Sequence, residues 1–273
     1  MEKIRRNERM AAMLHILSES PNKLFTLSYF CEKFGSAKST MSEDIDILRD
    51  VVKDFDLGTV ETVTGAAGGV RFLAGMSRPA AIRVLNEICE TLMDPSRVLP
   101  GNYLYFPDIL SMPGYVEKMG TIIAQEYYES RPDFVLTMET KGIPVAFSAA
   151  NALGVPLVIA RRVSKVYEGS AVNINYVTGS SGSIETMSLS RRAVQEGQKC
   201  LIVDDFLRGG GTARGMCELM REFKVQVMGM AFVMATAQND RKRMPNTKAL
   251  MVMEPDATGE GFNIHPASWL QDA

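Results

Sequence analysis

The stretch Cys200-Leu-Ile-Val-Asp-Asp-Phe-Leu-Arg-Gly-Gly-Gly-Thr-Ala213 decides the fold of this chain. Three apolar residues lead into two adjacent carboxylates, Asp204 and Asp205, and a glycine-rich segment follows before a helix-favouring run, Ala213 to Phe223. A short apolar run before a glycine-rich loop and a helix is typical of a buried parallel strand and its turn. Such a loop directs free backbone N–H groups and the positive end of the helix dipole at one point, which suits a phosphate. The stretch therefore predicts a parallel α/β fold with an anion site.

The position of the carboxylates distinguishes this loop from other phosphate-binding loops. A Walker loop needs Lys and then Ser or Thr after its glycines, whereas Gly211 is followed by Thr212 and Ala213. A dinucleotide-binding loop has its acid roughly 20 residues after the glycines. Two acids just before the cradle can accept hydrogen bonds from vicinal hydroxyls of a ribose whose 5-phosphate lies on the glycines. The pattern resembles the phosphoribosyl-pyrophosphate (PRPP) motif of type I phosphoribosyltransferases, although an ordinary glycine-rich turn with exposed acids is the alternative.

Length and composition bound the class of protein. A chain of 273 residues, 46% of them hydrophobic, is long enough for two domains. The net charge of −2 gives no general attraction to polyanions, so a nucleic-acid surface must be local. Four scattered cysteines and two distant histidines predict neither a disulfide framework nor a metal site built from side chains. The N-terminus lacks a signal peptide's apolar core and no run is long enough to cross a membrane, so we expect a cytoplasmic protein without a membrane partner.

Residues 1–75 predict three helices followed by a β-hairpin. The second helix spans Leu27 to Phe34, and the third has Ser36 or Ser39 as its cap. One side of the third helix is apolar and comprises Met41, Ile45, Leu48, Val52 and Phe55. Strand-like segments at Thr59 to Thr64 and Val70 to Leu73 flank a glycine-rich turn. This order is the layout of a winged helix-turn-helix.

Small polar and basic residues begin the third helix, where a recognition helix reaches phosphates and base edges. The acids of this helix are expected beyond its groove-facing start. Charge does not itself favour DNA, because ten Lys and Arg stand against eleven Asp and Glu in residues 1–75. A bundle that contacts another protein is therefore the alternative. On layout we predict double-stranded DNA as the partner, with contacts from Arg5, Arg6, Arg9, Lys38, Ser39, Thr40, Ser42, Gly68 and Arg71.

From Pro132 onward, strand-like and helix-like segments alternate, which predicts a parallel sheet. The apolar strand Phe134 to Met138 is followed by a tight polar loop that contains Thr140, Lys141 and Gly142. A strand, a loop with glycine and a helix make a second candidate anion cradle, to which Lys141 adds positive charge.

Three cations follow the next strand, Val155 to Ala160, and these are Arg161, Arg162 and Lys165. The carboxyl end of a strand is where an open α/β sheet binds its ligand, although a solvated charge run has the same composition. A Ser- and Gly-rich hairpin at 167–190 is expected to cover the site. Tyr103, in an aromatic extended segment, is a candidate for stacking on a base or for simple half-burial.

Nearly the whole chain is similar to the purine-operon regulators of Gram-positive-type bacteria. The resemblance lies in Ser36-Ala-Lys-Ser39, Gly65 to Val70, Lys141-Gly-Ile-Pro144, Ser170 to Ser181 and Asp204-Asp-Phe206. It implies a winged-helix DNA-binding domain, residues 1–75, fused to a type I phosphoribosyltransferase-like domain, residues 76–273. It also implies a homodimer that regulates purine synthesis and transport genes, most often as a repressor, with some relatives acting as activators. PRPP would release the repressor from DNA, guanosine tetraphosphate would compete for the pocket, and Mg²⁺ would accompany PRPP without being a required cofactor.

The resemblance also assigns roles to the predicted site. Asp204 and Asp205 would hold the ribose hydroxyls, and the loop Gly209, Gly210, Gly211 and Thr212 the 5-phosphate. The pyrophosphate would meet Thr140, Lys141 and Gly142. A nucleotide's base would lie by Phe206 and Tyr103, near Leu207 and Arg208, and Arg161, Arg162 and Lys165 would supply positive charge.

One departure from the enzymes is visible in the loop. Phosphoribosyltransferases usually have a hydroxyl residue where Gly209 stands and a small residue where Arg208 stands, whereas the regulators commonly have Lys at the Arg208 position. We therefore expect no catalytic residues and no efficient turnover. The alternative is an active purine phosphoribosyltransferase with an accessory N-terminal domain, and a PRPP-binding protein that acts only through protein contacts is a third.

Overall fold

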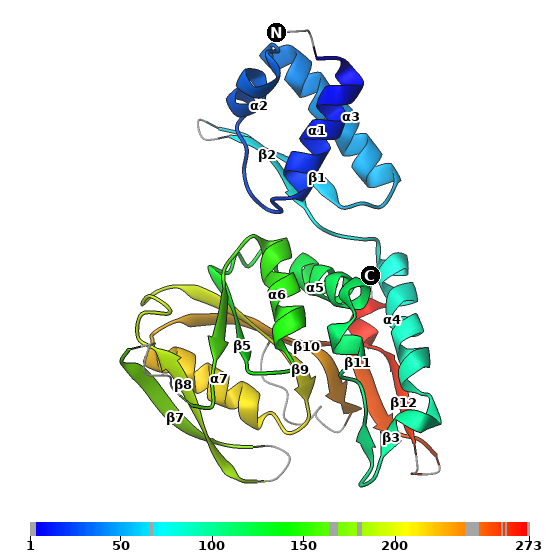
Figure 1. Ribbon diagram of the computed structural model, residues 1–273, viewed down its shortest axis with the longest axis vertical. Coiled ribbons are helices and arrows are strands. Elements are labelled where there is room, and N and C mark those ends of the chain that lie inside the picture. Colours follow the sequence, from blue (N-terminus) through cyan, green and yellow to red (C-terminus); the bar gives the residue numbers. More distant parts are fainter. Residues whose placement is uncertain are drawn as a thin grey trace. The chain divides into compact units, whose positions relative to one another are not determined.

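The computed structural model describes residues 4–65, 68–163, 169–178, 182–237, 246–257, 259 and 261–271. The chain separates into two compact units, and each is described by itself (Figure 1). The first comprises Met1–Ser77 with Asn151–Gly154, and the second comprises Arg78–Ala150 with Val155–Ala273. Within the described ranges, no helix combines the length and hydrophobicity needed to cross a bilayer.

The first unit is a winged helix-turn-helix, as predicted. Its elements are α1 (Arg6–Ser18), α2 (Leu27–Phe34), α3 (Lys38–Asp54), β1 (Thr59–Val63) and β2 (Gly69–Leu73). The two strands pair antiparallel as the wing. The three helices surround a core of apolar side chains spaced three and four residues apart, chiefly Met13, Leu17, Phe30, Met41, Ile45, Leu48 and Val52. Helix α2 ends at Gly35, whose φ of +59° is the left-handed conformation that glycine favours.

Two details of α3 differ from the prediction. The helix is capped at Ala37, which makes no side-chain cap hydrogen bond, so neither Ser36 nor Ser39 is its cap. The Ser36 hydroxyl instead donates to the Phe34 carbonyl at 3.3 Å. Phe55 was expected on the apolar side of α3. The helix ends at Asp54, so Phe55 lies just beyond its last residue and is 72% exposed.

The second unit is built on a six-stranded sheet in the order β12-β11-β10-β9-β5-β6. All neighbouring strands are parallel except β11 and β12, which are antiparallel. The strands are β5 (Phe134–Met138), β6 (Leu157–Ala160), β9 (Lys199–Leu207), β10 (Gln226–Thr236), β11 (Thr247–Pro255) and β12 (Phe262–Pro266). The helices are α4 (Arg78–Leu92), α5 (Pro113–Tyr127), α6 (Ile143–Leu153) and α7 (Gly211–Glu222).

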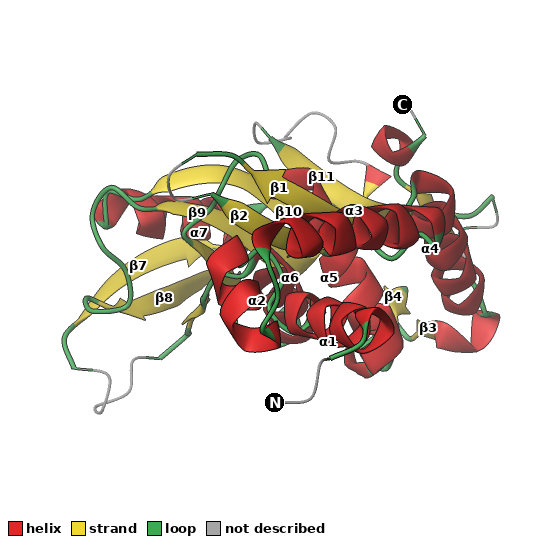
Figure 2. Ribbon diagram, turned by 90° about the horizontal axis from the view of Figure 1, so that it is seen from above, coloured by secondary structure: helices red, strands yellow, loops and turns green. Residues whose placement is uncertain are grey.

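Helices flank this sheet on both faces (Figure 2). The connections β5-α6-β6 and β9-α7-β10 run to opposite sides of the sheet centre, so right-handed crossovers place α6 and α7 on opposite faces. Helix α7 packs on its face together with the hairpin of β7 (Ala171–Val177) and β8 (Ile184–Ser190). A second, very short hairpin joins β3 (Val98–Leu99) to β4 (Tyr103–Leu104).

Strand β9 is longer than expected. The apolar run that leads into the acids is only three residues long, whereas β9 continues through Asp204 and Asp205 to Leu207. Asp204 pairs with Phe232 and Phe206 with Met234 of β10, so the neighbouring strand continues the ladder past the acids. The carboxylates are therefore held by a rigid central strand rather than by a turn.

Candidate functional site

The two carboxylates of β9 are buried in the second unit. Asp204 is only 6% exposed, and the Thr137 hydroxyl of β5 donates to its Oδ1 at 3.5 Å. Burial, and then the charge of Asp205, raise the pKa of Asp204 well above its usual value. Burial also raises the pKa of Asp205, and the nearby Lys141 ammonium opposes that rise. Two adjacent acids whose ionised forms are disfavoured by their surroundings are typical of a functional site.

The two loops predicted to bind anions meet at these acids. Gly142 approaches so closely that an added methyl group would overlap the Asp204 carboxylate and the Thr137 hydroxyl. Glycine is therefore required where the loop after β5 crosses the end of β9. Lys141 and Asp205 line the same cavity, which brings the charged residue of one loop to the acids of the other. Thr140 precedes them, and its carbonyl accepts the Ile143 N–H as α6 begins.

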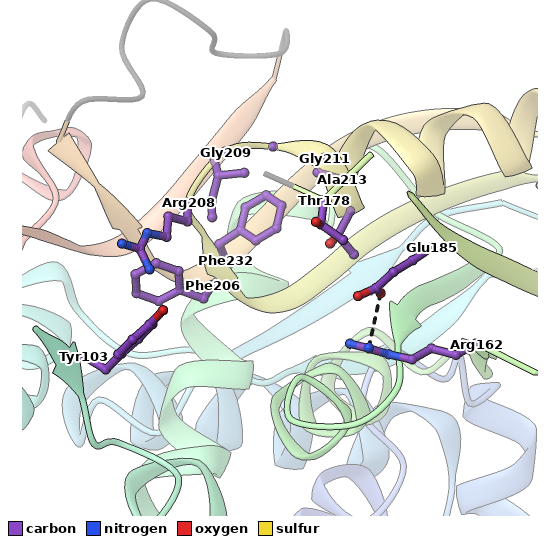
Figure 3. Close-up of a pocket in the computed structure, with 13 residues that line it drawn as sticks. Tyr103, Arg162, Thr178, Glu185, Phe206, Arg208, Gly209, Gly211, Ala213 and Phe232 are labelled. Carbon is purple, nitrogen blue, oxygen red and sulfur yellow. Dashed lines mark ion pairs between the residues drawn. The ribbon is translucent and has the colours of Figure 1, made fainter. Parts of the chain in front are cut away.

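The glycine-rich loop ends in a helix N-terminus. Gly210 has a φ of +70° and immediately precedes Gly211, the first residue of α7. The first N–H groups of a helix have no partner within the helix and carry the positive end of its dipole. Residues 209–213 line a cavity of about 300 Å³, which leaves ample room for a phosphate beside the start of the helix (Figure 3).

A second cavity, of about 840 Å³, is lined by Asp205 but not by the more deeply buried Asp204. Tyr103, Phe206 and Arg208 gather at one end of the close-up in Figure 3 and line both cavities. The Arg208 guanidinium lies over the Tyr103 ring, 5.5 Å from its centroid. The structure thus brings together the predicted residues of the two loops with Tyr103, while Leu207 lines the smaller cavity.

Sequence reasoning missed several lining residues of the larger cavity. Phe106 follows β4, and the others, Thr236, Ala237, Met253, Glu254, Pro255 and Phe262, lie at the ends of β10, β11 and β12. Their only signal in the sequence is that they come at predicted strand ends, because strand order decides which ends are neighbours.

The predicted cations are less available than expected. Arg162 lines the smaller cavity, but its Nη1 lies 3.1 Å from the Glu185 carboxylate of β8. Arg161 Nη1 lies 3.7 Å from Glu139, whose carboxylate also accepts the Arg162 N–H at 2.7 Å. The sequence did not indicate these carboxylate partners, which neutralise part of the positive charge. Lys165 lies outside the described residues.

The start of α3 presents the predicted polar residues. Lys38 is its first residue, and Lys38, Ser39 and Ser42 are exposed while Thr40 is half-buried. Glu43, the first acid of this helix, is exposed directly after Ser42, so a negative charge stands next to the predicted contact residues.

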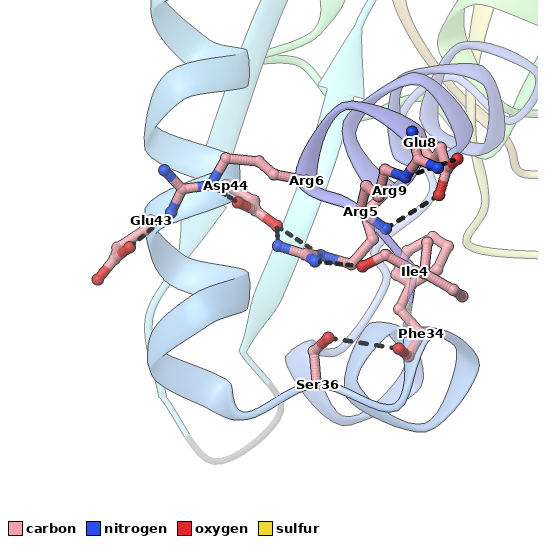
Figure 4. Close-up of polar contacts among 9 residues, drawn as sticks. All are labelled: Ile4, Arg5, Arg6, Glu8, Arg9, Phe34, Ser36, Glu43 and Asp44. Carbon is pink, nitrogen blue, oxygen red and sulfur yellow. Dashed lines mark hydrogen bonds and ion pairs between the residues drawn. The ribbon is translucent and has the colours of Figure 1, made fainter. Parts of the chain in front are cut away.

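Arg9 was predicted to contact DNA, and the structure contradicts this. Its side chain is 7% exposed and donates to the buried Asp44 carboxylate of α3 at 2.8 and 2.9 Å (Figure 4). Arg9 Nη1 also donates to the Ile4 carbonyl. Arg6 reaches the same aspartate at 3.0 Å and Glu43 at 2.8 Å, although half of its side chain remains exposed. Arg9 is therefore a tie between α1 and α3.

The remaining predicted DNA contacts are exposed to different degrees. Arg5 is exposed beside Glu8. Arg71 of β2 is mostly covered and donates to Glu61 at 2.6 Å and to Asn22 at 3.0 Å. The Gly68 N–H donates to the Gly65 carbonyl, and Gly68 directly precedes β2, the return strand of the wing. Most of these side chains already have carboxylate partners, which DNA phosphates would have to replace.

The second unit has the fold of known phosphoribosyltransferases. Adenine phosphoribosyltransferase from Saccharomyces cerevisiae superimposes with a TM-score of 0.52 at 20% identity, over 61% of this chain and 98% of that one. The family described as "Phosphoribosyl transferase domain" matches residues 108–268. The family described as "Bacterial purine repressor, N-terminal" matches residues 5–74, which is the winged-helix unit.

Curated relatives match nearly the whole chain. A probable purine biosynthesis transcriptional regulator, PurR, of Streptococcus pneumoniae serotype 4 is 43% identical over 264 residues, which is 96% of each chain. The purine biosynthesis transcriptional repressor PurR of Bacillus subtilis is 40% identical, over 92% of this chain and 88% of its own. The corresponding activator of Lactococcus lactis subsp. lactis is 39% identical, over 92% and 93%. With these matches over nearly its whole length, this chain belongs to the family of bacterial purine biosynthesis transcriptional regulators.

Proposed function

We propose that this protein binds control regions of purine synthesis and transport genes through its winged helix and takes PRPP as the effector in its second unit. One observation supports PRPP as the effector. Asp204 and Asp205 lie beside the loops 140–142 and 209–212 at the carboxyl ends of β5 and β9. That edge is where parallel sheets bind ligands. Relatives of similar identity are named repressor and activator, and we propose repression, relieved by PRPP.

Each part of PRPP has a complementary group in this arrangement. The ribose hydroxyls would donate to Asp204 and Asp205, which hold no proton of their own when ionised. The 5-phosphate would lie at the N-terminus of α7, where Gly210 and Gly211 leave room for close approach. The pyrophosphate would lie by Lys141, whose ammonium lines the larger cavity. Mg²⁺ would enter with the pyrophosphate and use Asp205 at most, since this ion commonly keeps phosphate and water ligands.

A nucleotide ligand would compete for the same groups. Its ribose and 5-phosphate would take the positions of those in PRPP, and its base would extend toward Tyr103 and Phe206. We propose guanosine tetraphosphate as such a competitor. The volume of the larger cavity, about 840 Å³, is sufficient for a purine base and additional phosphates.

We further propose that the second unit senses its ligand without efficient turnover. Gly209 supplies no hydroxyl to the phosphate loop, and Arg208 lies against Tyr103 at the cavity mouth. The protein would act as a homodimer in the cytoplasm, because two winged helices related by symmetry match two half-sites on chromosomal DNA. An active purine phosphoribosyltransferase is the competing function, favoured by the intact carboxylate pair and loops.

The decisive experiment is a fluorescence-anisotropy titration of DNA from upstream of a purine-synthesis operon, with and without PRPP, at one stated salt concentration. We expect tight, sequence-dependent binding that PRPP weakens. Strengthening by PRPP would establish an activator. If no specific binding is seen and purine bases are consumed in the presence of PRPP, the enzyme is the correct function.

A further inference from the structure

The aromatic end of the cavity belongs to a loop that has little support of its own. Residues 97–108 contain β3 and β4, which pair over only two residues each. An isolated two-stranded hairpin is marginally stable in water even when longer than this. Tyr103, which lines both cavities, is 56% exposed near the end of this hairpin, so burial does not hold its ring in place.

One arginine closes the loop at its base. Arg97 Nη1 and Nη2 donate to the two Asp108 carboxylate oxygens at 2.9 and 2.8 Å. The same Nη1 donates to the Tyr105 carbonyl at 3.2 Å, and the Arg97 carbonyl accepts the Tyr105 N–H at 2.8 Å. The Arg97 side chain is 17% exposed and the Asp108 side chain 39% exposed, so the pair is partly shielded from water on the Arg97 side.

Such a pair is stronger than an ordinary surface ion pair. A planar guanidinium with two parallel hydrogen bonds to a carboxylate fixes the relative orientation of both side chains. The hydrogen bonds to Arg97 lower the pKa of Asp108, and those to Asp108 raise the pKa of Arg97, so both groups stay ionised. The only other aromatic anchor described in the loop is the Phe106 ring, whose centroid is 6.0 Å from that of Phe206.

We propose that Arg97 and Asp108 are positioning residues for a nucleotide base. Their pair fixes the loop that carries Tyr103, with its ring by Arg208 and on the same cavity as Phe206. The inference rests on the proposed ligand site and adds to it a means of selecting between ligands. PRPP has no base and is held by the acids and the two loops, whereas a purine nucleotide also needs the Tyr103 face. Loss of the Arg97–Asp108 pair therefore weakens the binding of nucleotides and leaves the binding of PRPP unchanged.

The test compares two ligands on the full-length chain by isothermal titration calorimetry. The ligands are PRPP and guanosine 5′-monophosphate, which share ribose 5-phosphate and differ in the base. Asp108→Asn keeps the shape of the side chain but removes its charge, and Arg97→Lys keeps the charge but loses the paired hydrogen bonds. We expect nucleotide affinity to fall about tenfold in each variant, which is roughly the value of one base–aromatic stack. PRPP affinity should stay within about twofold.

Two further variants separate positioning from general damage. The double exchange Arg97→Asp with Asp108→Arg should recover part of the nucleotide affinity, because the pair is restored in reverse. Lys224→Gln breaks the exposed ion pair with Glu196 in the same unit and should leave the affinity for both ligands unchanged. Equal loss of both ligands, or no loss of either, would overturn the positioning role. A wild-type chain that binds neither PRPP nor the nucleotide would refute the proposed function, and the inference with it.

Discussion

Each unit of the chain buries an aspartate, and the two aspartates have opposite surroundings. Asp44 of the winged helix has no exposed surface and is met by the guanidinium groups of Arg9 and Arg6. Asp204 of the second unit is almost as buried, but its neighbours are the Thr137 hydroxyl and a second acid, Asp205. A buried charge with its counter-charge in place strongly destabilises the fold when one of the two partners is removed. A buried charge beside a like charge at a cavity is arranged for a ligand that brings hydrogen-bond donors or a cation.

The largest expected effect follows from removing the compensated aspartate. Asp44→Ala leaves the Arg9 guanidinium buried without its carboxylate, which typically destabilises a fold by about 3–5 kcal/mol. We expect the first unit to unfold at much lower urea concentration, as followed by circular dichroism. Trp269 is the single tryptophan and lies in the second unit. The unfolding transition reported by its fluorescence should occur at the same urea concentration as in the wild type.

Asp46→Ala is the matched control for this variant, because Asp46 is on the same helix and pairs with Arg49 at the surface. Its effect should be at most about 0.5 kcal/mol. Equal effects of the two substitutions would show that the buried tie between α1 and α3 contributes no more than a surface ion pair.

Removing one of the two acids of the second unit should abolish the response to the effector without affecting folding. Asp205→Ala takes away one of the carboxylates proposed to accept from the ribose hydroxyls. We expect PRPP affinity to fall roughly 100-fold, which corresponds to the loss of about two charge-assisted hydrogen bonds. DNA affinity should be unchanged, so the variant is a repressor that PRPP does not release. Anisotropy titrations with and without PRPP measure both quantities. Release of DNA by PRPP at wild-type concentrations would mean that the ligand lies elsewhere, and Glu196→Gln serves as an exposed control.

A smaller effect is expected at the start of α3. Lys38→Glu reverses a charge at the first residue of the helix and should weaken operator DNA binding about tenfold at moderate salt, with a shallower salt dependence. Lys53→Glu makes the same change in the last turn of the same helix and should have little effect. If both substitutions weaken DNA binding equally, the net charge of the unit determines the affinity and the start of α3 is not the contact surface. PRPP affinity should stay unchanged in both.

The comparison of the two aspartates also explains which predictions succeeded. The apolar run before the acids, the glycines and the following helix are local patterns, so β9 with its two acids and α7 were readable from the sequence. The tie between α1 and α3 was readable too, but it was missed. Arg9, Met13 and Leu17 lie four residues apart on one helix face, and Asp44 lies three residues after Met41 on the apolar face of α3. A cation and an acid on the buried faces of two helices predict a buried pair.

Other features depend on the tertiary structure alone. Arg161 pairs with Glu139, which directly follows β5, and Arg162 pairs with Glu185 of β8, so both partners depend on how β5, β6 and the hairpin β7–β8 are arranged. The lining residues Glu254 and Phe262 reach the cavity because β10, β11 and β12 are adjacent in the sheet. Local periodicity carries no information on strand order, so sequence patterns predicted the core of the site and not its far wall.

The smallest expected effect has the opposite sign to the others. Asp204→Asn replaces a buried acid by a neutral side chain of the same shape, and we expect the second unit to become more stable by on the order of 1 kcal/mol near pH 7.5. Burial and Asp205 raise the pKa of Asp204 in the folded chain above its unfolded value, so the folded state holds its proton more tightly. The stability of the wild type therefore falls as the pH rises between the two pKa values, and the advantage of the variant grows over the same range and disappears in acid. Melting curves of Trp269 fluorescence at several pH values measure this difference, while PRPP affinity should decrease because the amide accepts through only one oxygen. A variant that is less stable at pH 7.5, by an amount independent of pH, would show that Asp204 supports the fold as Asp44 does, and the contrast between the two units would be lost.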